Sequence, residues 1–255
     1  MISAADIKYY SSLKQKKHRE ESGKFLIEGF HLIEECLNSS YHLDLIIIRD
    51  DIELNEYPAI SKKIKDKKIK IELLQKKSFT KLSETENSQG IIGVVSKKIN
   101  QTEKSKAKII IALDRITDPG NLGTILRTAY WFGVELILVS GNSVDIYNSK
   151  TIRASQGAIF HTDVRENTDL LSRLNEFKDN GYKVYLLTPK GTDNLKGINK
   201  GAKSVFVFGN EADGISEELF NSGFHLLKIE GFTDCESLNV AVSSAIVLYE
   251  FSNGK

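Results

Sequence analysis

The chain has 255 residues, of which 40% are hydrophobic and 27% are charged, and its formal net charge is +1. This composition predicts a soluble globular protein, and the length is comfortable for two domains. No apolar run approaches the ~20 residues that a membrane-spanning helix needs, and the first residues lack the pattern of a signal peptide. The two cysteines, Cys36 and Cys235, have no metal-binding or redox spacing, so we expect a cytoplasmic protein that binds no metal.

The first part of the chain predicts a small α/β domain. Apolar side chains recur at helical spacing over residues 29–37. Short apolar runs typical of strands occur at 25–27, 45–48, 69–74 and 90–95. We therefore expect a domain over residues 1–98, followed by a polar linker over 99–105.

Basic residues are unevenly distributed along the chain. Residues 1–104 carry a net charge of +3 and residues 105–255 a net charge of −2, and six lysines lie between Lys62 and Lys70. Such a stripe can follow the phosphate groups of a nucleic acid. A charge run of this kind is more typical of a solvated helix face, so charge alone favours that interpretation over contact with a nucleic acid.

The second part of the chain, residues 106–255, predicts a parallel sheet flanked by helices. Short runs that are apolar on both faces alternate here with helical segments, which is the pattern of strands buried on both sides. The runs lie at 109–113, 136–139, 184–187, 205–208 and 226–229. Ligands of such sheets bind beyond the carboxyl ends of the strands.

Three polar, glycine-containing segments each accompany the end of a predicted strand. They lie at 118–127, 206–214 and 229–239. Segments of this composition can bring bare backbone up to a small ligand, so we predict that the three form one composite site. In the first of them, Asp118 is expected to cap a helix that begins at Pro119.

Individual residues of these segments allow both a functional and a structural interpretation. Arg127 lies on the second turn of its helix, where it could bind a phosphate or carboxylate or pair with a surface acid. Glu211 could orient Arg127 or accept a proton, or it could lie near the N-terminus of a helix that begins at Ser216. Ser237 could cap the last helix or contact a ligand. The absence of a dinucleotide or P-loop glycine pattern disfavours a phosphate-bearing cofactor.

Together the three segments resemble, in order and spacing, the motifs of the SpoU/TrmH branch of the SPOUT RNA methyltransferases. The resemblance covers residues 106–255, and residues 1–98 resemble the ribosomal-protein-like α/β domain that often precedes them and binds the substrate. It implies a deep trefoil knot, S-adenosylmethionine as the methyl donor and a homodimer formed through the knotted domain. The implied reaction is methylation of a ribose 2′-hydroxyl in structured RNA, with ribosomal RNA as the expected substrate and transfer RNA as the alternative.

The resemblance also assigns roles to particular residues. Residues 155–157 resemble the segment that lies near the substrate and the dimer seam. The implied catalytic residues are Asn121, Arg127, Glu211, Ser237 and Asn239. The implied donor-binding residues, which act largely through their backbone groups, are Thr188, Pro189, Gly209, Asn210, Gly214, Ile229, Gly231 and Leu238.

The acceptor of the hydroxyl proton is not identified by these residues. An arginine that acted as a base at neutral pH would need its pKa lowered by about five units, which corresponds to roughly 7 kcal/mol. We therefore expect Arg127 to act as a cation that anchors a phosphate and favours the developing alkoxide. Two other functions stay open: a non-catalytic RNA-binding protein of the same fold, and a nucleotide-dependent oxidoreductase, which a parallel sheet alone would allow.

Overall fold

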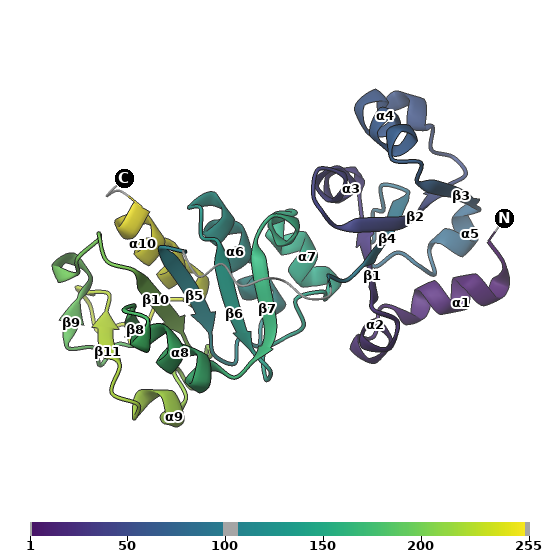
Figure 1. Cartoon of the computed structure of the whole chain (residues 1–255). Coiled ribbons are helices and arrows are strands. Elements are labelled where there is room, and N and C mark those ends of the chain that lie inside the picture. Colours follow the sequence, from purple (N-terminus) through teal and green to yellow (C-terminus); the bar gives the residue numbers. More distant parts are fainter. Residues whose placement is uncertain (1, 99–106, 253–255) are drawn as a thin grey trace. The chain divides into compact units, whose positions relative to one another are not determined.

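The computed structural model describes residues 2–98 and 107–252, so the predicted linker over 99–105 lies outside the described residues. The chain divides into two compact units (Figure 1). The first contains residues 1–100 and 147–160, and the second contains residues 101–146 and 161–255. The domain bounds expected from the sequence, 1–98 and 106–255, remain a prediction.

The first unit is built on a four-stranded sheet of order β1-β4-β2-β3. The strand β4 pairs antiparallel with β1 and β2, and β2 pairs parallel with β3. The strands are β1 (Lys24–Glu28), β2 (His42–Arg49), β3 (Lys70–Leu74) and β4 (Ile91–Ser96). The helices are α1 (Ala4–Ser12), α2 (Lys16–Ser22), α3 (Phe30–Leu37), α4 (Pro58–Asp66), α5 (Lys76–Phe79) and α7 (Ser149–Ser155), with 3-10 turns η1 (Leu54–Glu56) and η2 (Ala158–Phe160). The four strands and the helix predicted in this part are confirmed.

Residues 147–160 share the core of the first unit through aromatic side chains. The ring of Tyr147 lies 4.5 Å from that of the buried Phe25 in β1, and the ring of Phe160 lies 5.2 Å from that of Tyr41. Nothing in the composition of this segment distinguishes it from its neighbours in sequence, so its membership of the first unit was not predicted.

The second unit is built on a seven-stranded sheet of order β7-β6-β5-β10-β8-β11-β9, in which every recorded pair is parallel (Figure 1). Its strands are β5 (Ile109–Leu113), β6 (Leu136–Ser140), β7 (Asp163–Thr168), β8 (Lys183–Leu187), β9 (Asp193–Asn194), β10 (Ser204–Phe208) and β11 (His225–Lys228). The parallel sheet and its five predicted strands are confirmed. The edge strands β7 and β9 were missed because one is largely polar and the other has two residues.

Helices cover both faces of this sheet. They are α6 (Pro119–Trp131), α8 (Leu170–Asp179), α9 (Glu217–Phe220) and α10 (Val240–Ser252), and a 3-10 turn η3 (Leu195–Gly197) precedes β10. Side chains alternate between the faces of a strand. Val205 and Val207 of β10 therefore pack in one cluster with Leu174 of α8. Phe206 faces the other side, where its ring lies 4.5 Å from that of Phe251 in α10. On that side α10 packs against α6.

The parallel arrangement gathers several loops at one edge of the sheet. Because all strands run in the same direction, the segments that follow β5, β8, β10 and β11 leave the sheet at the same edge. The loop after β8 meets the end of β11 directly, since the N–H of Thr188 donates to the carbonyl of Leu227 at 2.9 Å.

In the part of the chain that the structure describes, no helix is both long enough and apolar enough to cross a membrane.

Candidate functional site

The helix α6 begins at the site with a capped N-terminus. The Asp118 Oδ1 accepts a hydrogen bond from the N–H of Asn121 at 2.7 Å, and Pro119 occupies the first helical position. Both features were predicted, and they follow from the free N–H groups that every helix start presents. The backbone N–H groups of Thr117 and Asp118 remain directed at the loop that follows β10.

The carboxylate of Glu211 joins this helix start to the loop after β10. Its Oε2 accepts from the N–H and the hydroxyl of Thr117, at 3.2 and 3.0 Å. Its Oε1 accepts from the N–H of Asp118 at 3.2 Å and from the Asn121 Nδ2 at 3.0 Å. Two loops that are about 90 residues apart in the sequence are therefore held at one side chain.

The surroundings of Glu211 favour its ionised form. Partial burial alone would raise the pKa of this carboxyl, but the hydrogen bonds from the Asn121 side chain and from backbone N–H groups outweigh it and lower the pKa below its ordinary value. At neutral pH Glu211 is consequently an acceptor of hydrogen bonds and holds no proton. Two functional roles were expected for Glu211: to orient Arg127 or to accept a proton. The structure forms no contact between Glu211 and Arg127.

Asn121 joins Glu211 to the segment before α10. Its Oδ1 accepts from the Asn239 Nδ2 at 3.0 Å, while the Asn239 Oδ1 accepts from the N–H groups of Ala241 and Val242, at 2.8 and 3.3 Å. Asn239 therefore caps α10, and of the two interpretations of Ser237 the capping one is wrong. The helix begins two residues later than a cap at Ser237 would place it. The asparagine at position 239 satisfies the N–H groups of its first turn.

The loop after β10 closes into a tight turn. Asn210 and Gly214 exchange two backbone hydrogen bonds, at 2.9 and 3.0 Å, and the Asn210 Oδ1 accepts from the N–H groups of Ala212 and Asp213. A Cβ on Gly209 would lie 2.3 Å from the carbonyl carbon of Gly214. Glycine is thus required at position 209 because two stretches of backbone touch there.

The loop after β8 approaches the end of β11 in a similar way. A Cβ on Gly191 would lie 2.5 Å from the backbone of Leu227 and of Lys228. This contact brings Thr188 and Pro189 to the edge from which the segment at 229–239 departs. Gly191 was not among the predicted site residues, because a lone glycine carries no signal of what it touches.

The remaining predicted residues differ in how closely they are held. Arg127 is exposed on α6, and among the described residues it forms no hydrogen bond or ion pair. Ser237 is also exposed, and its carbonyl accepts from the Cys235 thiol at 3.4 Å. Gly231 and Leu238 are exposed as well, whereas Ile229 is half-buried. The structure thus brings Asn121, Glu211 and Asn239 together and leaves Arg127 and Ser237 outside their hydrogen bonds.

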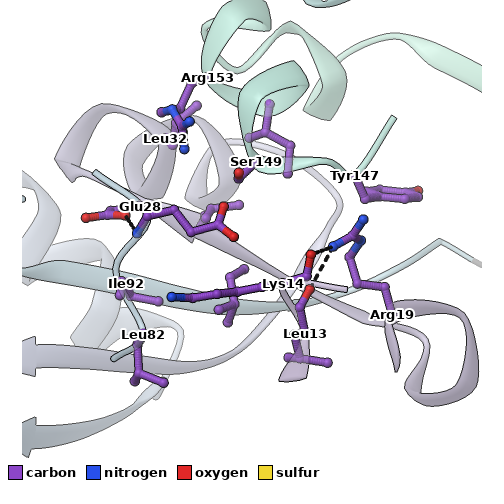
Figure 2. Close-up of a pocket in the computed structure, with 14 residues that line it drawn as sticks. Leu13, Lys14, Arg19, Glu28, Leu32, Leu82, Ile92, Tyr147, Ser149 and Arg153 are labelled. Carbon is purple, nitrogen blue, oxygen red and sulfur yellow. Dashed lines mark hydrogen bonds between the residues drawn. The ribbon is translucent and has the colours of Figure 1, made fainter. Parts of the chain in front are cut away.

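A pocket in the first unit is lined by the turn between α1 and α2 and by residues of β1, β4 and α7 (Figure 2). Its volume of about 30 Å³ suits one or two water molecules, whereas ligand sites usually exceed ~300 Å³. Two of its three basic side chains are engaged: Arg19 donates to the carbonyls of Leu13 and Lys14, and the Lys14 Nζ donates to that of Ser83. The described residues also contain no cluster of side chains that could hold a metal ion.

Comparison with known proteins relates both parts of the chain to RNA modification. The model of the SpoU rRNA Methylase family matches residues 108–249, and the model of the MRM3-like substrate binding domain matches residues 4–93. A relative from Bacillus subtilis (strain 168), the 23S rRNA (guanosine(2553)-2′-O)-methyltransferase RlmP, is 32% identical over 244 residues. The match covers 95% of this chain and 94% of that protein.

Solved structures share the fold over the whole chain. An AdoMet-bound rRNA methyltransferase from Sinorhizobium meliloti has a TM-score of 0.85 and 26% sequence identity, with coverage of 100% of this chain and 97% of that one. A structure described as an RNA 2′-O ribose methyltransferase has a TM-score of 0.82 and 25% identity, with coverage of 98% and 96%. These similarities concern both units of the chain.

The Glu211→Gln variant should lose the connection between the two loops. A glutamine side chain would turn an NH₂ group toward N–H donors, so we expect a loss of about 1 kcal/mol in the free energy of unfolding by urea. Because the folded-state pKa of Glu211 is lowered, its contribution is fully present above the ordinary carboxyl pKa and disappears as pH falls through the folded-state value. Glu217→Gln, at an exposed carboxylate of α9, is the control, and equal losses for both variants would contradict this role.

The Gly209→Ala variant should distort the turn at 209–214. The added methyl group would overlap backbone that cannot rotate away, and overpacking of this kind usually costs about 1–3 kcal/mol. Gly231→Ala is the matched control, because a Cβ at position 231 meets no atom within 4 Å. Urea unfolding of both variants measures the difference, and an unchanged midpoint for Gly209→Ala would show that the close approach is absent.

Proposed function

Because this chain belongs to the SpoU rRNA methylase family, as the match over residues 108–249 establishes, we propose that it methylates a ribose 2′-hydroxyl of ribosomal RNA in the cytoplasm. The proposed methyl donor is S-adenosylmethionine. The relative from Bacillus subtilis is a 23S rRNA 2′-O-methyltransferase, and the relative from Sinorhizobium meliloti was solved with AdoMet bound. The resemblance recognised in the three segments is thereby confirmed.

The observation that carries the proposal is the joining of the three motif segments. Glu211, Asn121 and Asn239 come one from each segment, and two consecutive hydrogen bonds of 3.0 Å link them. Residues from distant parts of the chain meet in this way at the edge of a parallel sheet where ligands bind. An inactive member of the family with the same three residues would form the same hydrogen bonds, so activity has to be measured.

The segment at 229–239 fits a donor that is held by backbone groups. Among the described residues, the backbone of 230–238 forms no hydrogen bond to another backbone group. Apart from the Cys235 N–H and the Ser237 carbonyl, which bond to side chains, its N–H and C=O groups are therefore available to a ligand. The turn at 209–214 and the loop at 188–191 border the same edge, and each contains a glycine where a Cβ would collide with backbone. We assign the donor to this edge, and the deep trefoil knot implied by the family is part of the proposal.

Arg127 is proposed to hold the RNA beside the donor. The donor supplies a methyl group on a positively charged sulfur, so the nucleophilic oxygen and the methyl carbon have to be aligned. An exposed guanidinium without an ion pair among the described residues can bind an RNA phosphate with two parallel hydrogen bonds. Its charge would also stabilise the oxygen as the hydroxyl proton leaves.

The activity is tested directly with RNA that lacks modification. The full chain is incubated with radiolabelled S-adenosylmethionine and either ribosomal or transfer RNA, and the labelled nucleotide is mapped. We expect label at a ribose of ribosomal RNA. Label only in transfer RNA would establish the alternative substrate. Donor binding without label in either RNA would favour the non-catalytic alternative, and binding of a nicotinamide nucleotide would favour an oxidoreductase.

The Arg127→Lys variant should separate RNA positioning from donor binding. A lysine keeps the charge but not the planar fork, so we expect turnover to fall about 100-fold, in the range found when one stabilising donor is lost. Donor affinity, measured by calorimetry, should change less than about 2-fold, because the donor contacts are assigned to backbone groups. Arg173→Lys in α8 is the control. A parallel loss of donor affinity would contradict the role given to Arg127.

We also propose that two copies of the chain pack through the outer face of α10. Val242, Ala245, Ile246 and Tyr249 recur on that face, and Val242 and Tyr249 are 48% and 59% exposed. The inner face of α10 is apolar as well, and a helix that is apolar all round is normally buried on every side. A second copy of the chain would cover this surface symmetrically.

The Val242→Glu variant should weaken the proposed dimer. A carboxylate in the centre of an apolar contact would be desolvated without a partner, and we expect the dissociation constant in analytical ultracentrifugation to rise at least about 30-fold. Leu73→Glu is the control, because Leu73 is 62% exposed on β3 of the first unit. A wild-type chain that stays monomeric at high concentration would contradict the dimer.

A further inference from the structure

Arg115 occupies an unusual backbone conformation between two of the site's loops. It follows Asp114 at the end of β5. Its φ of +57° lies in the left-handed region, which residues other than glycine rarely adopt. Such a conformation is energetically unfavourable and persists only where the surroundings hold it. Neither its position in the sequence nor the resemblance of the three segments identified Arg115 as a site residue.

The backbone of Arg115 is held from both sides. Its N–H donates to the hydroxyl of Ser140 at the end of β6, at 2.8 Å, and its carbonyl accepts from the Asn210 Nδ2 at 2.7 Å. Its neighbour Asp114 accepts from the N–H of Ser216 at 2.7 Å. The strands on either side of β5 thus fix the strained residue.

The side chain of Arg115 reaches the turn at 209–214. Its Nη2 donates to the carbonyl of Gly214 at 3.1 Å, and its Nη1 lies 3.8 Å from the Asp213 carboxylate. Its Nε lies 3.4 Å from the Asp114 carboxylate, and the Arg115 side chain is 29% exposed. The carbonyl of Gly214 also closes the turn by accepting from the N–H of Asn210. The guanidinium therefore binds the turn at the group on which its closure depends.

We propose that Arg115 is a positioning residue for the methyl donor, which acts by holding the turn at 209–214 in its donor-binding shape. The inference rests on the proposed function, since it takes this turn as part of the donor site. The left-handed backbone aims the guanidinium across the loops, and its planar fork spans a carbonyl and two carboxylates. A lysine would place one point charge there and could not span them.

A substitution that relieves the strain separates this role from a general contribution to stability. In Arg115→Gly the backbone bonds to Ser140 and Asn210 remain possible, and glycine adopts a positive φ without cost. In Arg115→Asn the backbone conformation is tolerated too. Relief of strain offsets the lost side-chain contacts, so the urea midpoint of both variants should fall little or not at all. Their affinity for the donor should nevertheless fall at least about 10-fold.

The matched control is Lys68→Gly. Lys68 has a φ of +53° in the first unit, so this variant relieves the same kind of strain away from the turn, and its donor affinity should equal that of the wild type. The variants are compared by calorimetric titration of the full chain with S-adenosylmethionine and by steady-state kinetics. We expect the KM for the donor to rise in Arg115→Gly, Arg115→Asn and Arg115→Lys, while the KM for RNA stays unchanged.

Each outcome bears on a different claim. If the wild type binds the donor and the Arg115 variants bind it equally well, the positioning role is overturned and the proposed function stands. If affinity falls only in proportion to the urea midpoint across the three variants, Arg115 is a structural residue and the inference is again overturned. If the wild-type chain binds no donor, the proposed function fails and the inference fails with it.

Discussion

The loop that follows β10 and the loop that opens α6 meet at the carboxylate of Glu211, and the arrangement of the site depends on that contact. Ionised Glu211 accepts hydrogen bonds from Thr117, Asp118 and Asn121, and the free N–H groups of a helix start are well suited to such an acceptor. The Asn121 amide is in turn hydrogen-bonded to Asn239. One charged group and two amides thus join the three segments to one another.

The sequence predicted the elements that depend on local pattern. Doubly apolar runs identified the strands β5, β6, β8, β10 and β11, and Asp118 before Pro119 identified the start of α6. The start of α10 was misplaced because Ser237 and Asn239 are both good caps, and only the helical backbone decides between them. The strand β7 was missed because its polar residues lack the apolar run by which the other strands were recognised.

The contacts that join distant segments could not be predicted in the same way. The partners of Glu211 follow from the order of strands in the sheet, which places β10 beside β5, and no local pattern encodes that order. The same holds for Gly209, whose requirement for glycine comes from backbone of Gly214, and for the strained backbone of Arg115. The family resemblance supplied the identity of the motif residues, and the structure supplies the interactions between them.

A crystal structure of the full chain with S-adenosylmethionine tests the central claim most directly. The account predicts that the donor lies at the carboxyl edge of the second unit's sheet, against backbone of the turn at 209–214 and of the segment at 229–239. It also predicts that the hydrogen bonds of Glu211 with Thr117 and Asn121 persist in the complex. A donor bound elsewhere, or bound at this edge with Glu211 released from both partners, would contradict the account.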